Sequence, residues 1–102
     1  MESDFIYHIT RKNQWEEAKE LGHFDSDTLA TEGFIHCSTE AQVSGVLDRY
    51  YKGQTGLVKL KIARVKVERP LVFELASSIN EVFPHIHGAL NLDAVVEVSE
   101  IV

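Results

Sequence analysis

Leu57-Val58-Lys59-Leu60-Lys61-Ile62-Ala63, at residues 57–63, is the stretch that decides the fold class. Apolar and polar side chains alternate along it, which is the pattern of a β-strand with one buried face. Val58, Leu60 and Ile62 are expected to point into the core, and the two lysines toward solvent.

Further strands and helices are predicted on both sides of this stretch. Strands are expected at residues 4–10, 34–37, 71–75 and 94–98, helices at 10–21 and 39–50, and a loop with room for a short strand at 22–33. Thr39 and Gln42 have the spacing of a capping box, as do Asn13 and Glu16, and Gly22 is a helix stop. Strand and helix alternate only in the first half, which favours an α+β fold over a doubly wound parallel sheet. We expect a split, mostly antiparallel sheet with two main helices.

The length and the charge of the chain restrict the class of protein. With 102 residues, 44% of them hydrophobic, the chain is expected to form a single domain spanning residues 1–102. The formal net charge of -6 opposes general binding to nucleic acid, whose phosphates attract basic proteins. The sequence holds no run of about 20 apolar residues, so no membrane segment is expected. A small molecule is the expected partner, and the sequence leaves the oligomeric state open.

The chain is expected in the cytoplasm. Its start, Met1-Glu2-Ser3-Asp4, is acidic and lacks the basic and apolar segments of a secretory signal. Cys37 is the only cysteine, so no internal disulfide can form, which fits a reducing compartment. We expect Cys37 to be a small buried residue on the strand face opposite His36.

Two predicted strands carry a histidine in the same pattern. His8 shares a strand face with Thr10, and His36 shares one with Phe34 and Ser38. A fully buried face would need partners for these polar groups, and a fully exposed face would not carry a phenylalanine. Both faces therefore fit the floor of a half-open cleft. The alternative is that each histidine satisfies a buried backbone group.

A third histidine lies in the segment Phe83-Pro84-His85-Ile86-His87-Gly88. Proline fixes one φ angle and glycine permits unusual ones, so the segment predicts a shaped turn rather than a strand interior. Such a turn could aim His85 at a ligand shared with His8 and His36, or it could leave its histidines in water. The His85-x-His87 spacing also suggests a metal site, but neither a CxxC nor an HExxH pattern accompanies it, and we expect no metal.

Glu74 is the carboxylate expected to be perturbed. It lies in the apolar strand predicted at residues 71–75, where it would be partly desolvated and could act as an acid, a base or a stabiliser of positive charge. The alternative is an edge strand on which Glu74 faces water. The basic residues between Lys59 and Arg69 are expected to form a solvated strand face and turn, with phosphate binding as the lesser alternative.

With these residues, the chain resembles a family of small bacterial and plant proteins known as domain of unknown function 952. The resemblance spans nearly the whole chain. It rests on Tyr7-His8-Ile9-Thr10, on Trp15 with Ala18, on Gly33-Phe34-Ile35-His36-Cys37-Ser38, and on Phe83-Pro84-His85 with Gly88.

That family in turn resembles the fold of the ADP-ribosyltransferases and RNA 2′-phosphotransferases, whose split sheet binds NAD in a cleft through a first-strand His-x-Thr or His-x-Ser. By this resemblance, His8 and Thr10 would hydrogen-bond a ribose. Glu74 would be the transferase glutamate, which stabilises the cationic ribosyl transition state. NAD is the cofactor that the resemblance implies. The candidate catalytic residues are Glu74 and His36, and the candidate substrate-binding residues are His8, Thr10, Ser38 and His85.

Three hypotheses about function follow. The first is a protein that binds NAD, ADP-ribose or a related nucleotide and transfers a ribosyl or phosphoryl group. The second is a non-catalytic module that binds a small ligand or a protein in the same cleft. It fits two departures from the transferases. Ile9 stands in place of a glycine, and the sequence has no obvious arginine partner, with Arg11 only a loose candidate. The third is a metal-dependent hydrolase built on the histidines.

Overall fold

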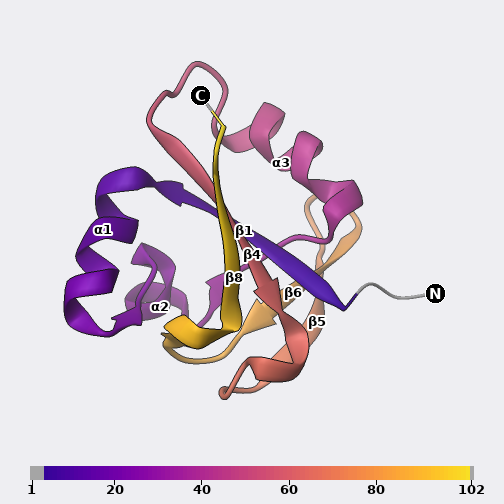
Figure 1. The fold of residues 1–102 in the computed structure, drawn as a ribbon. Helices are drawn as coiled ribbons and strands as arrows, with labels where there is room; N and C mark the ends of the chain where they lie inside the picture. The colour runs from indigo at the N-terminus through magenta and orange to yellow at the C-terminus, as the bar shows by residue number, and fades with distance from the viewer. Residues whose placement is uncertain (1–3, 102) are drawn as a thin grey trace.

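The computed structural model describes residues 4–101 and has the mixed α+β architecture that the sequence predicts (Figure 1). Met1-Glu2-Ser3, which support the expectation of no secretory signal, and Val102 lie outside the described residues. The elements are β1 (Phe5–Arg11), α1 (Lys12–Leu21), β2 (His23–Phe24), α2 (Asp27–Glu32), β3 (Ile35–His36), α3 (Val43–Tyr50), β4 (Leu57–Ala63), β5 (Leu71–Ala76), β6 (Glu81–Ile86), β7 (Leu90–Asn91) and β8 (Val95–Glu100). Short 3₁₀ turns lie at η1 (Glu40–Gln42), η2 (Arg64–Lys66) and η3 (Leu92–Ala94).

The strands form two three-stranded sheets and a small two-stranded one. The first sheet has the order β1-β4-β8, the second has the order β3-β6-β5, and β2 pairs with β7. All strand pairs within residues 4–101 are antiparallel, so the predicted mostly antiparallel arrangement is confirmed. In Figure 1, α1 and α2 lie on the left of the sheets and α3 lies on the upper right. Over the described residues, none of the helices has both the length and the apolar character needed to span a membrane.

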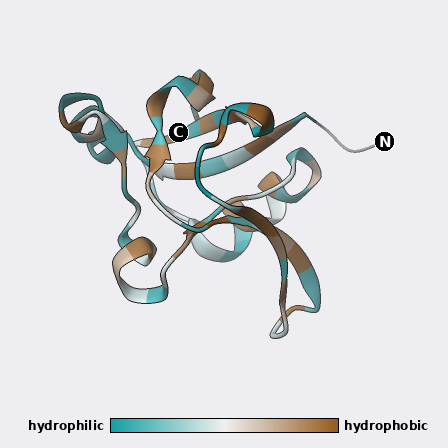
Figure 2. Cartoon of the chain, turned by 90° about the horizontal axis from the view of Figure 1, so that it is seen from below, coloured by the Kyte–Doolittle hydropathy of each residue, from teal (hydrophilic) through white to brown (hydrophobic). Residues whose placement is uncertain are grey.

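β4 is the central strand of the first sheet, and its alternation has the predicted effect. Val58, Leu60 and Ile62 are at most 2% exposed and belong to the main hydrophobic core. On the opposite face, Lys59 and Lys61 lie over aromatic rings of β1. Both lysines are partly exposed, and their side chains pack on these rings through cation–π contacts. In Figure 2, the strands near the centre carry many of the hydrophobic, brown positions.

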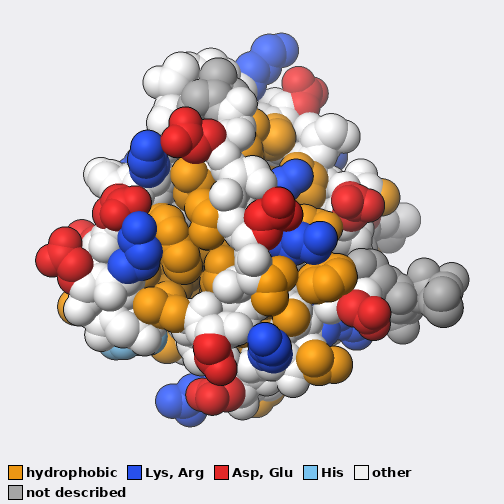
Figure 3. All heavy atoms as spheres, in the orientation of Figure 1, with side chains coloured by type: hydrophobic (Ala, Val, Ile, Leu, Met, Phe, Trp, Pro, Cys, Tyr) orange, Lys and Arg blue, Asp and Glu red, His pale blue; other side chains and the backbone are white. Residues whose placement is uncertain are grey.

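β8 is an edge strand of the first sheet, and it leaves apolar side chains at the surface. Val96 is 46% exposed and Val98 is 40% exposed. Figure 3 shows the face on which β8 lies in front, where hydrophobic side chains gather in the middle and acidic and basic side chains surround them. Surrounding charges of this kind discourage pairing between exposed strand edges.

The two larger sheets are joined by a backbone bridge between Tyr7 and Ser38. The Tyr7 N–H donates to the Ser38 carbonyl at 2.8 Å, and the Ser38 N–H donates to the Tyr7 carbonyl at 2.7 Å. Tyr7 belongs to β1, whereas Ser38 follows β3. The bridge therefore holds the end of β3 against β1, the strand that carries His8 and Thr10.

The prediction of a turn at Phe83-Pro84-His85 is wrong, because these residues lie inside β6. Proline is tolerated there because of the direction in which its missing N–H would point. The Pro84 carbonyl accepts from the Cys37 N–H at 3.0 Å, so both backbone groups of this residue face the β3 side. β3 ends at His36, so the N–H that Pro84 lacks would point to a place where regular β3–β6 pairing has already ended. The hydrogen bonds between β6 and β5 are therefore not interrupted.

The helix signals of the sequence are partly confirmed. The capping box of Thr39 and Gln42 is present at η1, immediately before α3, and Gly22 ends α1 with a φ of 91°. The second predicted capping box, at Asn13 and Glu16, is wrong. α1 begins at Lys12, so Asn13 lies inside the helix and cannot act as its N-cap residue. The segment 22–33 contains the expected short strand, β2, but also the helix α2. None of the α2 residues is buried, so the sequence carries no apolar stripe that would reveal it.

Replacing Gly88 by alanine should destabilise the fold by about 2–3 kcal/mol. Its φ is 148°, and an added Cβ would lie 2.7 Å from the Cγ of Arg69. Gly53→Ala is the matched control, because its φ is 82° but nothing lies within 4 Å of the added Cβ. It should cost only about 1 kcal/mol, from backbone strain alone. Urea unfolding measures both losses, and equal values would contradict the close approach of Arg69 to Gly88.

Candidate functional site

A cavity of about 720 Å³ opens between the two larger sheets. Its lining draws on β1, the segment from α2 to Ser38, α3 with the residues after it, and the β5–β6 hairpin. The predicted site residues that line it are His8, Thr10, His36, Ser38 and His85. These residues are far apart in the sequence, and the fold brings them to one opening. Glu74, the remaining predicted site residue, does not line the cavity.

His8 is a buried, neutral imidazole with a fixed tautomer. Its Nδ1 lies 2.5 Å from the His36 carbonyl oxygen, which can only accept, so Nδ1 carries the hydrogen. Burial lowers the pKa of His8 to about 4. The hydrogen bond to this carbonyl raises the pKa, but by less than burial lowers it. Within residues 4–101, Nε2 of His8 has no hydrogen-bond partner. All buried side-chain nitrogen and oxygen atoms of these residues do have a partner, so Nε2 is not among the buried atoms. Its Nε2 lone pair is therefore open to the cavity as a hydrogen-bond acceptor.

His36 lies at the rim of the cavity rather than at its floor. Its Nε2 lies 3.2 Å from an oxygen of Glu32 in α2, and both side chains are 48% exposed. Its ring meets the His85 ring edge-on, with 5.0 Å between the centroids. His36 thus contributes its carbonyl to the fixation of His8, and its side chain to the cavity mouth.

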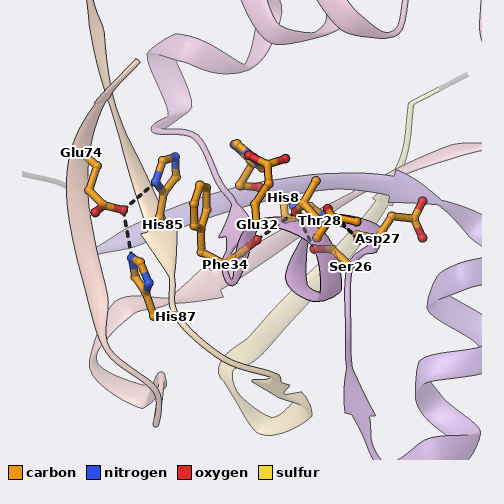
Figure 4. A network of polar contacts seen from close by, with 11 residues as sticks. His8, Ser26, Asp27, Thr28, Glu32, Phe34, Glu74, His85 and His87 are labelled. Carbon is orange, nitrogen blue, oxygen red and sulfur yellow. Dashed lines mark hydrogen bonds and ion pairs between the residues drawn. The ribbon is translucent and has the colours of Figure 1, made fainter. Parts of the chain in front are cut away.

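His85 is held from two directions. Its Nδ1 lies 2.8 Å from Oε1 of Glu74, and its ring stacks on Phe34 with 4.2 Å between centroids and 17° between planes. Its side chain is only 8% exposed. Figure 4 shows Glu74 on one side of His85 and Phe34 on the other. The imidazole is thereby fixed in both position and tilt.

Glu74 connects two histidines on the same sheet face. Its Oε1 also lies 2.9 Å from Nε2 of His87, and these two hydrogen bonds, with His87 first and His85 second, lower the pKa of Glu74. The carboxylate is on β5, an edge strand, and it is 40% exposed. The edge-strand alternative therefore describes its location, although the carboxylate is paired with both histidines. Its contact with the cavity is indirect, through His85.

Thr10 begins a short chain of polar contacts that the sequence did not reveal. Its hydroxyl donates to Oε1 of Gln14 at 2.7 Å, and Nε2 of Gln14 donates to Oδ1 of Asp27 at 3.2 Å. Gln14 and Asp27 both line the cavity. The spacing of Thr10 and Gln14 could have suggested the first contact, but Asp27 lies on the unpredicted helix α2. Ser38 is 5% exposed, and its hydroxyl has no partner within residues 4–101, so it too is reached from the cavity.

The remaining lining residues set the polarity of the cavity. Aromatic side chains come from Phe34, Phe83, Tyr50 and Tyr51, and Arg11 is the one Lys or Arg in the lining over the described part of the chain. Cys37 also borders the cavity, but it is buried, and burial raises the pKa of its thiol, so the sulfur is not a nucleophile at neutral pH.

No group of three or more His, Cys, Asp or Glu side chains suited to a metal ion is found in residues 4–101. His85 and His87 share a carboxylate oxygen, and His8 is bonded to a backbone carbonyl.

The family described as "Protein of unknown function (DUF952)" matches residues 9–98. The chain belongs to this family. The match includes every predicted site residue except His8, which immediately precedes it. Membership in DUF952 confirms the resemblance drawn from the sequence motifs, and the family description assigns no activity to it.

Solved structures of another protein resemble this DUF952 chain along most of its length. A crystal structure of CC0527 from Caulobacter crescentus is 28% identical in sequence, covers 94% of this chain and 84% of that one, and has a TM-score of 0.85. A double mutant of CC0527 gives the same values. The solution NMR structure of CC0527 is 27% identical, covers 97% and 85% of the two chains, and has a TM-score of 0.83. No curated protein matches this DUF952 chain.

The stability of the protein should fall as His8 is forced to accept a proton. The pKa of His8 in the folded protein, about 4, lies below the ordinary histidine value of about 6.5. Between these two pH values, the unfolded chain binds a proton at His8 and the folded chain does not. Stability from this group is therefore lost as the pH falls through about 6.5, and the loss ends below about 4. Between pH 7.5 and pH 5, the loss should be about 2 kcal/mol.

Urea unfolding of His8→Gln at the same two pH values tests this assignment. The variant should lose most of that pH dependence, because glutamine does not titrate. His23→Gln is the matched control, since His23 is exposed beside Asp25. It should behave like the natural protein. A slope that stays equally steep in His8→Gln would contradict a buried, neutral His8.

Proposed function

We propose that this protein binds a ribose-containing nucleotide of the NAD or ADP-ribose class in the cavity lined by His8, Thr10, Ser38 and His85. The observation that carries the proposal is the convergence of these buried polar side chains on one opening of about 720 Å³. Ligand sites are typically concavities of roughly 300–1,000 Å³ with mostly apolar walls and a few placed polar groups. The cavity has both features.

The hydrogen-bonding groups suit a ribose. His8 offers a fixed acceptor at Nε2, and the Ser38 hydroxyl can both donate and accept. The hydroxyls of a ribose likewise both donate and accept, so they match this mixture better than a purely anionic ligand would. Thr10, already bonded to Gln14, adds an acceptor next to His8 on the same face of β1.

The remainder of a nucleotide also finds chemical partners in the lining. Phe34, Phe83, Tyr50 and Tyr51 provide rings on which a nicotinamide or adenine could stack. Arg11 provides a cation for phosphate. A single cation is a modest counter-charge for a pyrophosphate, so binding should depend on the ribose and ring contacts more than on phosphate attraction.

The proposal includes a relationship to the ADP-ribosyltransferase and RNA 2′-phosphotransferase fold. It is supported by two antiparallel sheets that meet at a bridge, with His8-Ile9-Thr10 on one strand and His36-Cys37-Ser38 beside it. The location of Glu74 differs from that of a glutamate acting directly on a ribosyl cation, because it reaches the cavity only through His85. Ribosyl or phosphoryl transfer is therefore the second part of the proposal, and nucleotide binding is the first. We place this activity in the cytoplasm, where the lone thiol of Cys37 would stay reduced.

The specific alternative is a binding module without catalysis, and the indirect position of Glu74 favours it. Release of free nicotinamide from NAD separates the two. An enzyme would release it faster than a blank without protein, and the rate would fall in a Glu74→Ala variant. A binding module would leave NAD intact while still being stabilised by it.

Thermal unfolding with added ADP-ribose or NAD tests the proposal. A ligand present at 100 times its dissociation constant adds about 2.7 kcal/mol to stability, which should raise the melting temperature by roughly 10 °C in a chain of this size. The double variant Thr10→Val, Ser38→Ala should lose most of this rise while remaining folded.

Val65→Ala is the control for that double variant, because Val65 is 88% exposed and does not line the cavity. It should keep the full rise. If neither nucleotide changes the melting temperature of the natural protein at millimolar concentration, the proposed ligand class is wrong.

A further inference from the structure

We infer that His85 is the acid–base group of the cavity, with Nε2 as the atom that exchanges a proton with the ligand and Glu74 as the residue that positions it. The inference rests on the proposed function only for the identity of the ligand that supplies the proton. The pair itself can be tested without any nucleotide.

The hydrogen bond to Glu74 determines which nitrogen of His85 is free. A carboxylate can only accept, so the Nδ1 at 2.8 Å from Oε1 must carry the hydrogen. In the neutral imidazole, Nε2 then holds the lone pair. A second N–H, from His87 at 2.9 Å, binds the same oxygen and holds the carboxylate in place. The hydrogen bond from Nδ1 to Glu74 thus favours the tautomer of His85 in which Nδ1 carries the hydrogen and Nε2 does not.

The free nitrogen of His85 opens to the cavity. His85 lines the cavity, and within residues 4–101 its Nε2 has no hydrogen-bond partner. Because no buried side-chain nitrogen or oxygen among those residues is unpaired, this atom must be reached from the opening. Stacking on Phe34 prevents the ring from tilting away. The lone pair is therefore aimed before any ligand arrives, which is the condition for efficient proton transfer.

The neighbouring histidines are less suited to this role. His8 has its own open Nε2, but its partner is an uncharged carbonyl, and burial opposes the charged form of its ring. His36 is paired with Glu32, but both side chains are about half exposed, so water screens that pair. Only His85 combines a buried ring, a carboxylate partner and an open nitrogen among the cavity histidines.

The inferred step is a single proton transfer. Nε2 of His85 takes the proton of a ligand hydroxyl or of a water held next to the ligand, and the oxygen keeps the electron pair of the broken O–H bond. The imidazolium that forms is balanced by the negative charge of Glu74, which remains ionised. Returning the proton from Nε2 to a leaving oxygen restores the starting state. No metal or redox partner is needed for this exchange.

The first test is the tautomer of His85 in the natural protein, measured from the ¹⁵N shifts of its ring nitrogens at pH 8. The inference requires that Nδ1 carries the hydrogen and Nε2 does not. A His85 found mainly with the hydrogen on Nε2 would overturn it. This measurement needs neither a ligand nor a variant.

The second test is chemical reactivity toward diethyl pyrocarbonate, read by peptide mass mapping. The lone pair of a neutral imidazole nitrogen attacks the reagent's carbonyl carbon, ethyl carbonate leaves, and the ring proton is released. His85 should be modified faster than His8 in the natural protein. In Glu74→Ala, the rate at His85 should fall by about tenfold, which is the lower end of the contribution of a hydrogen bond to a charged group.

Asp25→Ala is the matched control, since it removes the carboxylate partner of His23, and neither of these residues lines the cavity. It should leave the rate at His85 unchanged. Equal rates at His85 in the natural protein and in Glu74→Ala would overturn the positioning role. If the tautomer and the reactivity behave as inferred but ADP-ribose gives no thermal shift, the ligand class fails while the acid–base pair stands.

Discussion

The site depends on the backbone bridge between Tyr7 and Ser38. Two hydrogen bonds of 2.7 and 2.8 Å fix the segment after β3 against β1. One residue beyond Tyr7, the side chain of His8 reaches the carbonyl of His36, so the same junction also fixes an imidazole. Without this junction, the two larger sheets would share no strand pairing within residues 4–101, and the cavity between them would have no floor.

Around that junction, the protein gives its three cavity histidines three different environments. His8 is bonded to a neutral carbonyl and stays uncharged, His36 is at the rim beside a half-exposed carboxylate, and His85 is buried with a carboxylate behind it. Because the environment rather than the residue type determines what an imidazole can do, these three have separate roles. One is a fixed acceptor, one meets solvent, and one is held by a carboxylate.

The sequence predicted those features that depend on local patterns. The alternation in residues 57–63 predicted a strand with one buried face, and the capping box at Thr39 predicted the start of the second main helix. The repeated pattern around His8 and His36 predicted that both form the floor of one cleft; both line the cavity, but His36 lies at its rim. The turn predicted at Pro84 was wrong because the cost of proline in a strand depends on which neighbour its nitrogen faces. That is a property of strand order and not of the local sequence.

The sequence singled out Glu74 as a candidate catalytic residue, but its contact with His85 was beyond sequence reasoning for a similar reason. Its contact with His85 arises because β5 and β6 pair with Glu74 opposite Phe83, which places it diagonally next to His85 on the same face. A shift by one residue would turn its side chain to the other face of the sheet. The contact between Gln14 and Asp27 was likewise missed, because Asp27 lies on a helix that has no buried residue and so leaves no apolar pattern.

The most direct measurement of the central claim is a titration of the ¹⁵N-labelled protein with ADP-ribose, followed by backbone amide shifts. If the cavity is a nucleotide site, the largest changes will occur at His8, Thr10, Ser38 and His85, and they will saturate together with one dissociation constant. Changes confined to other surfaces, or none at millimolar ADP-ribose, would contradict the account.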